Sequence, residues 1–188
     1  MTRIVAGRAG GRRLATPRGD ATRPTSDRVR EALFSTLVSL LGDVDGLRFL
    51  DLYAGSGAVG LEAWSRGATA TLVESDRRTA GVVAANVREL GAGAEVRVVT
   101  AAVATFLERG PVEGAVFDVV FADPPYPLPE AAVAADLAAL VAHGWLAPDA
   151  AVVVERSSRS PEPTWPDGLE RELSRRYGET TLWYGHAP

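Results

Sequence analysis

From Leu47 onward, short apolar runs alternate with longer stretches in which apolar residues have helical spacing. This alternation is typical of a mostly parallel sheet with helices on both of its faces. A chain of 188 residues, 46% of them hydrophobic, has room for one compact domain and a small appendage. The expected strands are Arg48–Leu52, Ala70–Glu74, Glu95–Thr100, Phe117–Ala122 and Ala150–Glu155. The expected helices are Asp27–Leu41, Val59–Arg66, Arg77–Leu90, Ala102–Glu108 and Glu130–His143.

The two ends of the chain depart from this alternation. Residues 156–168 are rich in Ser and Pro, which predicts a loop. The residues after Gly168 alternate in polarity and break at Tyr177–Gly178, which predicts a final antiparallel hairpin. Near the N-terminus, residues 3–6 and 12–15 flank a Gly-rich turn and favour a small β-hairpin. The expected fold is therefore α/β and Rossmann-like, with a mostly parallel seven-stranded sheet that ends in an antiparallel hairpin.

Positive charge is concentrated at the N-terminus. The whole chain has a net charge of −4, but residues 1–30 hold eight arginines and two aspartates, a net charge of +6. We therefore divide the chain into a basic arm, residues 1–24, and a main domain, residues 25–188. The arm suits the neutralisation of phosphates, and a solvated tail is an equally good interpretation. Its glycines and scarce apolar residues predict that the arm is mobile alone and becomes ordered on RNA.

A glycine-rich loop follows the first expected strand of the main domain. Gly55, Gly57 and Gly60 satisfy the spacing G-x-G-x-x-G at a strand-to-helix turn, where glycine lets the backbone approach a ligand. The motif alone also fits a turn without a ligand, or a nicotinamide or flavin dinucleotide site. Asp51 favours a cofactor with an ammonium group, because a carboxylate would repel a pyrophosphate. Glu74, at the end of the next strand, can accept hydrogen bonds from ribose hydroxyls.

The most specific motif is Asp123-Pro124-Pro125-Tyr126, directly after the fourth expected strand. The two prolines hold Asp123 and Pro124 extended, so that the Asp123 carboxylate and the Pro124 carbonyl can converge on one amino group. Accepting both amine hydrogens localises the nitrogen lone pair, which can then attack the methyl of a sulfonium, and the acceptors stabilise the charge that reaches nitrogen. Tyr126 would stack on a base taken out of its helix. The alternative interpretation of these four residues is a surface turn or a polyproline ligand.

Together, DLYAGSGAVG and DPPY resemble the motifs of the class I S-adenosylmethionine-dependent amino-methyltransferases, over nearly the whole chain. The segment RPTSDRVREALF, with RIVAGRAGGRRLATP before it, is similar to the N-terminal signature of the bacterial guanine-N2 methyltransferases of 16S ribosomal RNA. This resemblance implies transfer of a methyl group to the N2 amine of guanine 966. The implied cofactor is S-adenosyl-L-methionine, and the implied partner is 16S rRNA within the small ribosomal subunit or its assembly intermediate.

The resemblance also assigns site residues. Many relatives place an acidic or polar side chain near the adenine after the third strand, but this chain has alanines there, so the adenine contacts fall to backbone groups. The implied catalytic residues are Asp123, Pro124, Pro125 and Tyr126. The implied cofactor-binding residues are Asp51, Tyr53, Ala54, Gly55, Gly57, Glu74, Ala101 and Ala102. The expected substrate-binding residues are Arg12, Arg13, Arg23, Arg28 and Arg30.

Composition restricts the other possibilities. The chain has no cysteine and two histidines, which predicts no metal site, and no apolar run approaches the length of a membrane span. We expect a monomer in the cytoplasm. The rival functions are an adenine-N6 methyltransferase on RNA or DNA, a protein-glutamine methyltransferase, a nicotinamide-dependent oxidoreductase and a non-catalytic RNA-binding module. The oxidoreductase leaves the DPPY motif unexplained, and the binding module has no need of the glycine loop.

Overall fold

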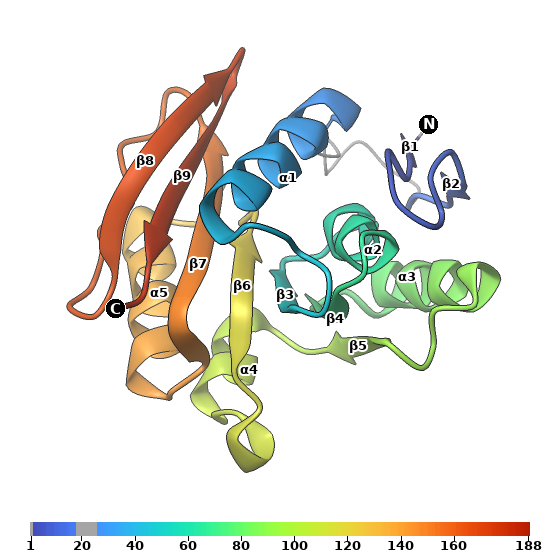
Figure 1. Ribbon diagram of the computed structural model, residues 1–188. Helices are drawn as coiled ribbons and strands as arrows, with labels where there is room; N and C mark the ends of the chain where they lie inside the picture. Colours follow the sequence, from blue (N-terminus) through green and yellow to red (C-terminus); the bar gives the residue numbers. More distant parts are fainter. Residues whose placement is uncertain (1, 18–25) are drawn as a thin grey trace.

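The computed structural model describes residues 2–17 and 26–188 and is built on a seven-stranded sheet (Figure 1). Its strand order is β5-β4-β3-β6-β7-β9-β8. The pairs among β3 to β7 are parallel, whereas β9 pairs antiparallel with both β7 and β8. The strands are β3 (Arg48–Leu52), β4 (Thr69–Glu74), β5 (Val96–Thr100), β6 (Phe117–Ala122), β7 (Leu146–Ser157), β8 (Glu170–Tyr177) and β9 (Thr180–His186). The predicted Rossmann-like sheet and its C-terminal hairpin are confirmed.

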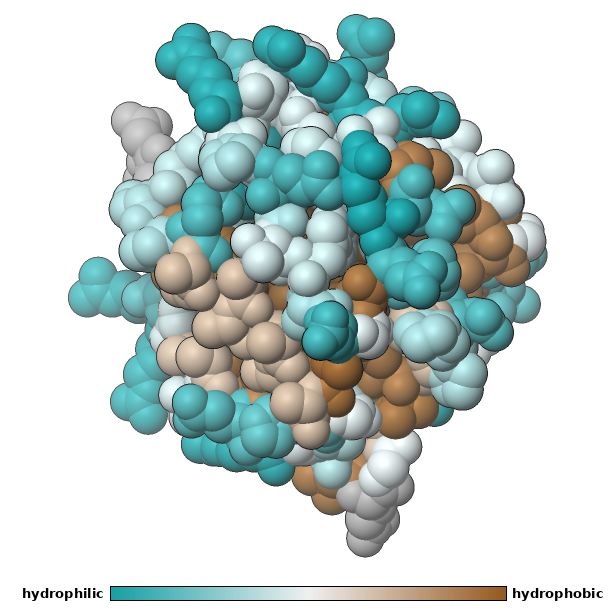
Figure 2. Space-filling model, turned by 90° about the vertical axis from the view of Figure 1, so that its left-hand side faces the viewer, coloured by the Kyte–Doolittle hydropathy of each residue, from teal (hydrophilic) through white to brown (hydrophobic). Residues whose placement is uncertain are grey.

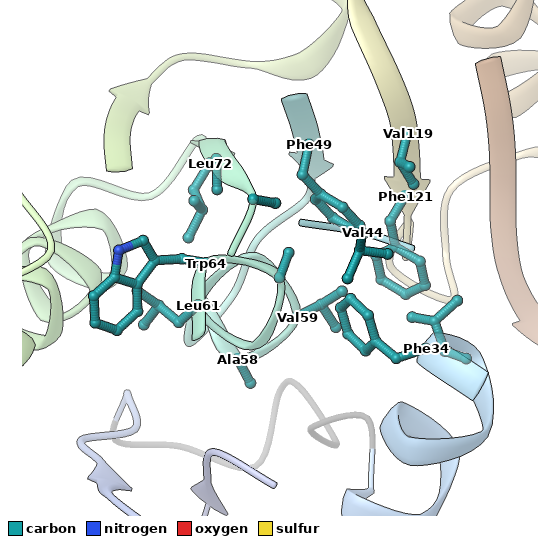
Figure 3. Packing of buried hydrophobic residues seen from close by; sticks show 14 of the residues in the cluster. Phe34, Val44, Phe49, Ala58, Val59, Leu61, Trp64, Leu72, Val119 and Phe121 are labelled. Atoms are coloured by element: carbon teal, nitrogen blue, oxygen red, sulfur yellow. The ribbon is translucent and has the colours of Figure 1, made fainter. Parts of the chain in front are cut away.

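Helices cover both faces of this sheet, because successive side chains of the central strands point to opposite faces. On one face, Phe49 of β3 and Phe121 of β6 pack against Phe34 and Val59 of the covering helices (Figure 3). On the other face, Leu50 and its neighbours pack against two further helices. The first layer contains α1 (Asp27–Leu41), α2 (Ala58–Ser65) and α3 (Arg77–Leu90), and the second contains α4 (Val103–Glu108) and α5 (Glu130–Ala142). A short 3-10 turn, η1 (Val112–Gly114), precedes β6.

The fifth parallel strand is longer than its expected range of Ala150–Glu155. Strand β7 begins at Leu146, which pairs with Phe117, and the register then shifts before Val119 pairs with Ala151. Asp149 has a positive φ of 59° within this irregular stretch. A bulge of this kind lets a strand continue past a proline, here Pro148, that a regular ladder would exclude. At its other end β7 continues to Ser157, so the predicted loop begins two residues later than expected.

Strand β8 forms one edge of the sheet and is protected against pairing with other chains by its charges. Most of its side chains are exposed, and its sequence ERELSRRY contains five charged residues. Figure 2 views the molecule from the side of this strand and shows mainly hydrophilic surface with apolar side chains between. Charged side chains on an exposed edge disfavour edge-to-edge association.

Residues 2–17 pack on the main domain, contrary to the prediction of a mobile arm without core residues. Strands β1 (Thr2–Arg3) and β2 (Arg13–Leu14) pair antiparallel, within the region expected to form a hairpin. Ile4 and Leu14 are buried in the core cluster that also contains the apolar side of α2. The buried carboxylate of Glu62, on α2, accepts hydrogen bonds from the backbone N–H of Val5 (2.6 Å) and Ala6 (3.0 Å). The main domain therefore supplies the burial that the segment's own composition lacks.

Candidate active site

The glycine loop connects β3 to α2, and its glycines meet two different requirements. A Cβ at Gly57 would lie 2.9 Å from Val83 Cγ1, and one at Gly60 would lie 2.7 Å from Leu72 Cγ, so both positions need glycine for close packing. Gly55 meets a different requirement, because its φ is positive, 55°. A Cβ there would have no atom closer than the Tyr53 carbonyl oxygen, at 3.9 Å. The open side of the loop is therefore at Gly55, where a ligand can approach the backbone.

Asp51 lies beneath this loop, on β3, with 1% of its surface exposed. One carboxylate oxygen accepts a hydrogen bond from the Gly60 N–H at 2.8 Å. Burial raises the pKa of Asp51 to about 7; the Gly60 hydrogen bond opposes this increase, and the charge of Glu74 adds to it. A buried carboxylate whose charge is so poorly compensated by the protein suits a cationic group of a ligand.

Glu74 connects the end of β4 to the same loop. Its carboxylate accepts hydrogen bonds from the Gly55 N–H at 2.9 Å and from the Asp76 N–H at 2.8 Å. Each carboxylate oxygen can accept more than one hydrogen bond, so acceptor capacity remains for hydroxyl groups. Its backbone carbonyl accepts from the Ala101 N–H at 3.1 Å, which places Ala101 beside the ends of β4 and β5. Ala102 is exposed and precedes the first turn of α4.

Tyr53 has a different environment from the one expected of a cofactor-binding side chain. Its φ is 62°, an unfavourable value for a residue with a Cβ, and its hydroxyl donates a hydrogen bond to the Asp136 carboxylate on α5. Burial raises the pKa of Asp136, and the Tyr53 hydrogen bond opposes that shift. The ring thus fixes the end of β3 to α5, and the adjacent Ala54 N–H donates to the Val73 carbonyl of β4.

The DPPY motif continues from β6 at the same edge of the sheet. The Asp123 N–H donates to the Leu52 carbonyl of β3 at 3.4 Å, which ties the motif to the start of the glycine loop. Pro124 is buried and Pro125 exposed, and Tyr126 is 67% exposed, an unusual position for a large aromatic ring. Burial raises the pKa of Asp123 well above its ordinary value; Glu155 and Asp51 add to this, and Arg156 opposes it. A carboxylate, a rigid proline pair and an exposed ring therefore lie together.

Sequence reasoning missed three polar residues of this region. Glu155 and Arg156 lie on β7 beside the DPPY motif, with 9% and 6% of their surface exposed. The Arg156 side chain donates to the Glu130 carboxylate at the start of α5, and so supports the segment that follows the motif. Asp136 is the third. The sequence does give a signal for Glu155, because Glu155 follows an apolar run in VVVE as Glu74 does in TLVE.

The arginines expected to bind RNA are in different environments. Arg13 and Arg28 are exposed, and Arg12 is exposed with one N–H donated to the Glu89 carbonyl. Arg23 lies outside the described residues. Arg30 is 0% exposed, and its guanidinium donates to the Arg3 carbonyl and the Asp27 carboxylate. Its position is therefore a correction to the expectation of phosphate contact: amphipathic spacing on α1 turns Arg30 toward the residue 2–17 segment.

Two other features are absent from residues 2–17 and 26–188. No group of three or more His, Asp or Glu side chains there is arranged to hold a metal ion. No helix in the same ranges is long and apolar enough to cross a membrane.

The strand order, the glycine loop and the position of the DPPY motif define the class I methyltransferase fold. A putative RNA methyltransferase from Pyrococcus horikoshii shares this fold at a TM-score of 0.69 and 18% identity, covering 93% of this chain and 90% of that one. A protein-family profile described as conserved hypothetical protein 95 matches residues 2–186. The chain belongs to that family, as the resemblance of its motifs predicted.

Named relatives agree with this assignment. The chain is 39% identical over 165 residues to the Escherichia coli K12 protein named ribosomal RNA small subunit methyltransferase D, covering 87% of this chain and 79% of the relative. It is 31% identical over 179 residues to the putative rRNA methyltransferase YlbH of Bacillus subtilis, covering 95% of both chains. The solved structure of the putative methyltransferase yhhF from Escherichia coli superposes with a TM-score of 0.84 at 34% identity, covering 99% of this chain and 97% of that one.

Proposed function

We propose that this protein transfers a methyl group from S-adenosyl-L-methionine to the exocyclic N2 amine of a guanine in small-subunit ribosomal RNA, namely guanine 966 of 16S rRNA. The observation that carries the proposal is the junction of the DPPY motif with the glycine loop, at the hydrogen bond from Asp123 to Leu52. Support for the RNA substrate comes from the relatives, whose names specify rRNA methylation.

The residues at the glycine loop fit the proposed cofactor. Gly55 leaves its side of the loop open, so that the cofactor can approach the protein backbone there. Asp51 is a buried carboxylate that a cationic ammonium would stabilise. Glu74 retains acceptor capacity for ribose hydroxyls. In our proposal the backbone of Ala101 and Ala102 contacts the adenine, and because the Ala101 N–H already donates to the Glu74 carbonyl, Ala102 supplies the N–H donor. When bound, the cofactor supplies an electrophilic methyl group on a sulfonium.

The chain's own residues hold the amine for attack. In our proposal the Asp123 carboxylate and the Pro124 carbonyl accept the two amine hydrogens, and the prolines keep both acceptors in place without reorganisation. Burial and the charge of Glu155 disfavour the ionised form of Asp123, as its raised pKa indicates. Positive charge that develops on the amine nitrogen therefore gains more from this carboxylate than from one in water. The methylated nitrogen then passes one proton to the Asp123 carboxylate, so the methylated base is neutral and the demethylated cofactor is the leaving group. Tyr126, already exposed, stacks on the extracted base.

Contact with the RNA backbone falls to the basic N-terminal region. Arg12, Arg13 and Arg28 are exposed and available for phosphates, and Arg23 completes the proposed set. The partner we propose is 16S rRNA in the small subunit or its assembly intermediate, met by a monomer in the cytoplasm. Because the hydrogen bonds from Val5 and Ala6 to Glu62 fix residues 2–17 to α2, Arg12 and Arg13 are held on the surface of the main domain.

The test is to incubate the protein with radiolabelled S-adenosylmethionine and, separately, with naked 16S rRNA, small ribosomal subunits or DNA. Nucleosides from the labelled product are then separated and identified by mass spectrometry. The proposal predicts N2-methylguanosine at position 966 from RNA or subunits. Labelled N6-methyladenosine, from RNA or DNA, would establish the rival adenine methyltransferase instead. Absence of label from all three, with binding of NADH, would point to the oxidoreductase.

A further inference from the structure

A small pocket lies where β6 and β7 end, directly beside the proposed catalytic motif. Asp123, Pro124 and Tyr126, which follow β6, line one side of it, and Glu155, Arg156 and Ser157 line it from β7. The two strands run parallel and side by side (Figure 1). The pocket is too small to enclose a purine, so it can receive the edge of a base while the ring lies outside, against Tyr126.

The sheet register places two carboxylates side by side in this pocket. Ala122, the last residue of β6, pairs with Val154, and the residues that follow these two in the chain are Asp123 and Glu155. Equivalent positions on neighbouring parallel strands direct their side chains to the same face of a sheet. The charge of Glu155 contributes to the raised pKa of Asp123, which is an independent sign that the two groups are close.

The pocket also contains polar groups that can donate hydrogen bonds. Arg156 is 6% exposed, and its Nε–H has no hydrogen-bond partner among the described residues, although its terminal nitrogen donates to Glu130 and to the Leu128 carbonyl. Ser157 pairs with Thr180 of β9, and both hydroxyl side chains border the pocket. Across the pocket from β6 to β9, the carboxylates of Asp123 and Glu155 thus provide two hydrogen-bond acceptors. The hydroxyls of Ser157 and Thr180 then provide donors.

This order of acceptors and donors is complementary to the Watson–Crick edge of guanine. On its Watson–Crick edge guanine carries the N2 amine, then the N1–H donor, then the O6 acceptor. Adenine has an acceptor at N1, and its single exocyclic amine is at position 6. If Asp123 holds the exocyclic amine, a second buried carboxylate beside it would face the N1–H of guanine but the N1 lone pair of adenine. Unpaired buried acceptors that face each other are costly, which is how polar sites reject near-isosteres.

We propose that Glu155 accepts the N1–H of the target base, beside the N2 amine held by Asp123, and thereby selects guanine over adenine. The hydroxyls of Ser157 and Thr180 donate to O6. This inference rests on the proposed guanine-N2 activity and assigns its base specificity to a residue outside the DPPY motif. Glu155 takes no part in transferring the methyl group; it holds the base in the orientation that brings N2 to Asp123.

The experiment uses small-subunit RNA ligated from synthetic and transcribed fragments, so that the target nucleotide is guanine, 2-aminopurine or 6-thioguanine. 2-Aminopurine keeps the N2 amine but has a lone pair at N1 and no O6. 6-Thioguanine keeps both N2 and N1–H and only weakens the acceptor at position 6. Each RNA is offered naked and assembled into subunits. The quantity measured is kcat/KM for label transfer, for the wild type, Glu155→Gln and the control Glu170→Gln, whose carboxylate is exposed on β8.

For the wild type we expect kcat/KM on 2-aminopurine to be lower than on guanine by at least about 100-fold, and 6-thioguanine to lie nearer guanine. In Glu155→Gln the side-chain amide can donate a hydrogen bond to the N1 lone pair of 2-aminopurine, whereas guanine loses the carboxylate that accepts its N1–H. We therefore expect kcat/KM on guanine to fall, and the ratio of kcat/KM on guanine to that on 2-aminopurine to narrow to within about 10-fold. Glu170→Gln keeps the wild-type ratio. Because the ratio compares two substrates on one preparation, partial misfolding of a variant does not change it.

Two results would overturn the inference. Wild-type protein that methylates guanine and 2-aminopurine equally well would show that nothing reads N1–H. A Glu155→Gln variant with the wild-type ratio would show that another residue does. In both cases guanine methylation by the wild type would leave the proposed function intact, whereas failure of the wild type to methylate the guanine RNA in either form would refute the proposed function and the inference together.

Discussion

Asp51 is expected to make the ligand-free protein less stable as pH rises. Its carboxyl group ionises near its ordinary value of 3.8 in the unfolded chain, but at about 7 in the folded protein because it is buried. The folded state therefore holds a proton over a pH range in which the unfolded chain has lost it. Stability is greatest below the unfolded pKa and falls as pH rises to the folded pKa. Asp51→Asn removes this cost while keeping an oxygen that can accept from Gly60.

The size of the effect follows from the pKa difference. A shift from 3.8 to about 7 corresponds to roughly 4 kcal/mol above neutral pH. Between about pH 5 and about pH 8 the wild type should lose roughly 2–3 kcal/mol from this group, and Asp51→Asn should not. Urea denaturation followed by circular dichroism at both pH values measures the difference. Calorimetry should show that the same variant loses affinity for S-adenosylmethionine, because the ammonium loses its carboxylate.

Asp118 is the matched control, at the opposite end of the sheet. It accepts two hydrogen bonds from the Arg48 guanidinium, and these lower the pKa of Asp118. Its contribution is complete above the unfolded pKa and is lost only at lower pH. Asp118→Asn should therefore change stability by the same amount at both pH values. Asp51→Asn that changes stability equally at both pH values, or binds the cofactor as tightly as wild type, would refute the reasoning.

Three further predictions concern the N-terminal segment and the substrate surface. Glu62→Ala should lower the free energy of unfolding by about 3–5 kcal/mol, because Arg66 and two N–H groups lose a buried charged partner; a loss below about 1 kcal/mol in urea denaturation would contradict this anchor. Tyr126→Ala should weaken RNA binding by about 1–3 kcal/mol in filter-binding assays and leave cofactor affinity unchanged, and equal RNA affinity would exclude stacking. Replacing Arg12 and Arg13 with Ala should reduce the slope of log affinity against log salt by up to about 1.8, while parallel slopes would show that neither contacts phosphate.

The sheet and the two motifs are predictable because their signals are local. Strand β6 is a short apolar run bounded by a proline pair, and the glycines at 55 and 57 immediately precede α2. The hairpin of β8 and β9 is signalled by alternation on either side of Gly178. In each case the residues that determine the structure are neighbours in the sequence.

The parts that were not predicted depend on partners far away in the sequence. Glu62 is a charged residue in a short helix, and nothing near it indicates that it is buried against Val5. The packing of Ile4 and Leu14 is likewise supplied by the main domain. Arg30 has the composition of an exposed phosphate contact and is buried because the N-terminal segment covers it. Glu155 is placed beside Asp123 only by the pairing of β6 with β7.

The most direct test of the account is methyl transfer by Asp123→Ala, measured together with binding of S-adenosylmethionine by calorimetry. The carboxylate is proposed to hold the amine and does not belong to the cofactor site, so the two measurements should separate. We predict loss of most methyl transfer from labelled cofactor to small-subunit RNA, with cofactor affinity within about a factor of three of wild type, less than 1 kcal/mol. Methyl transfer near the wild-type rate in this variant would contradict the proposed mechanism.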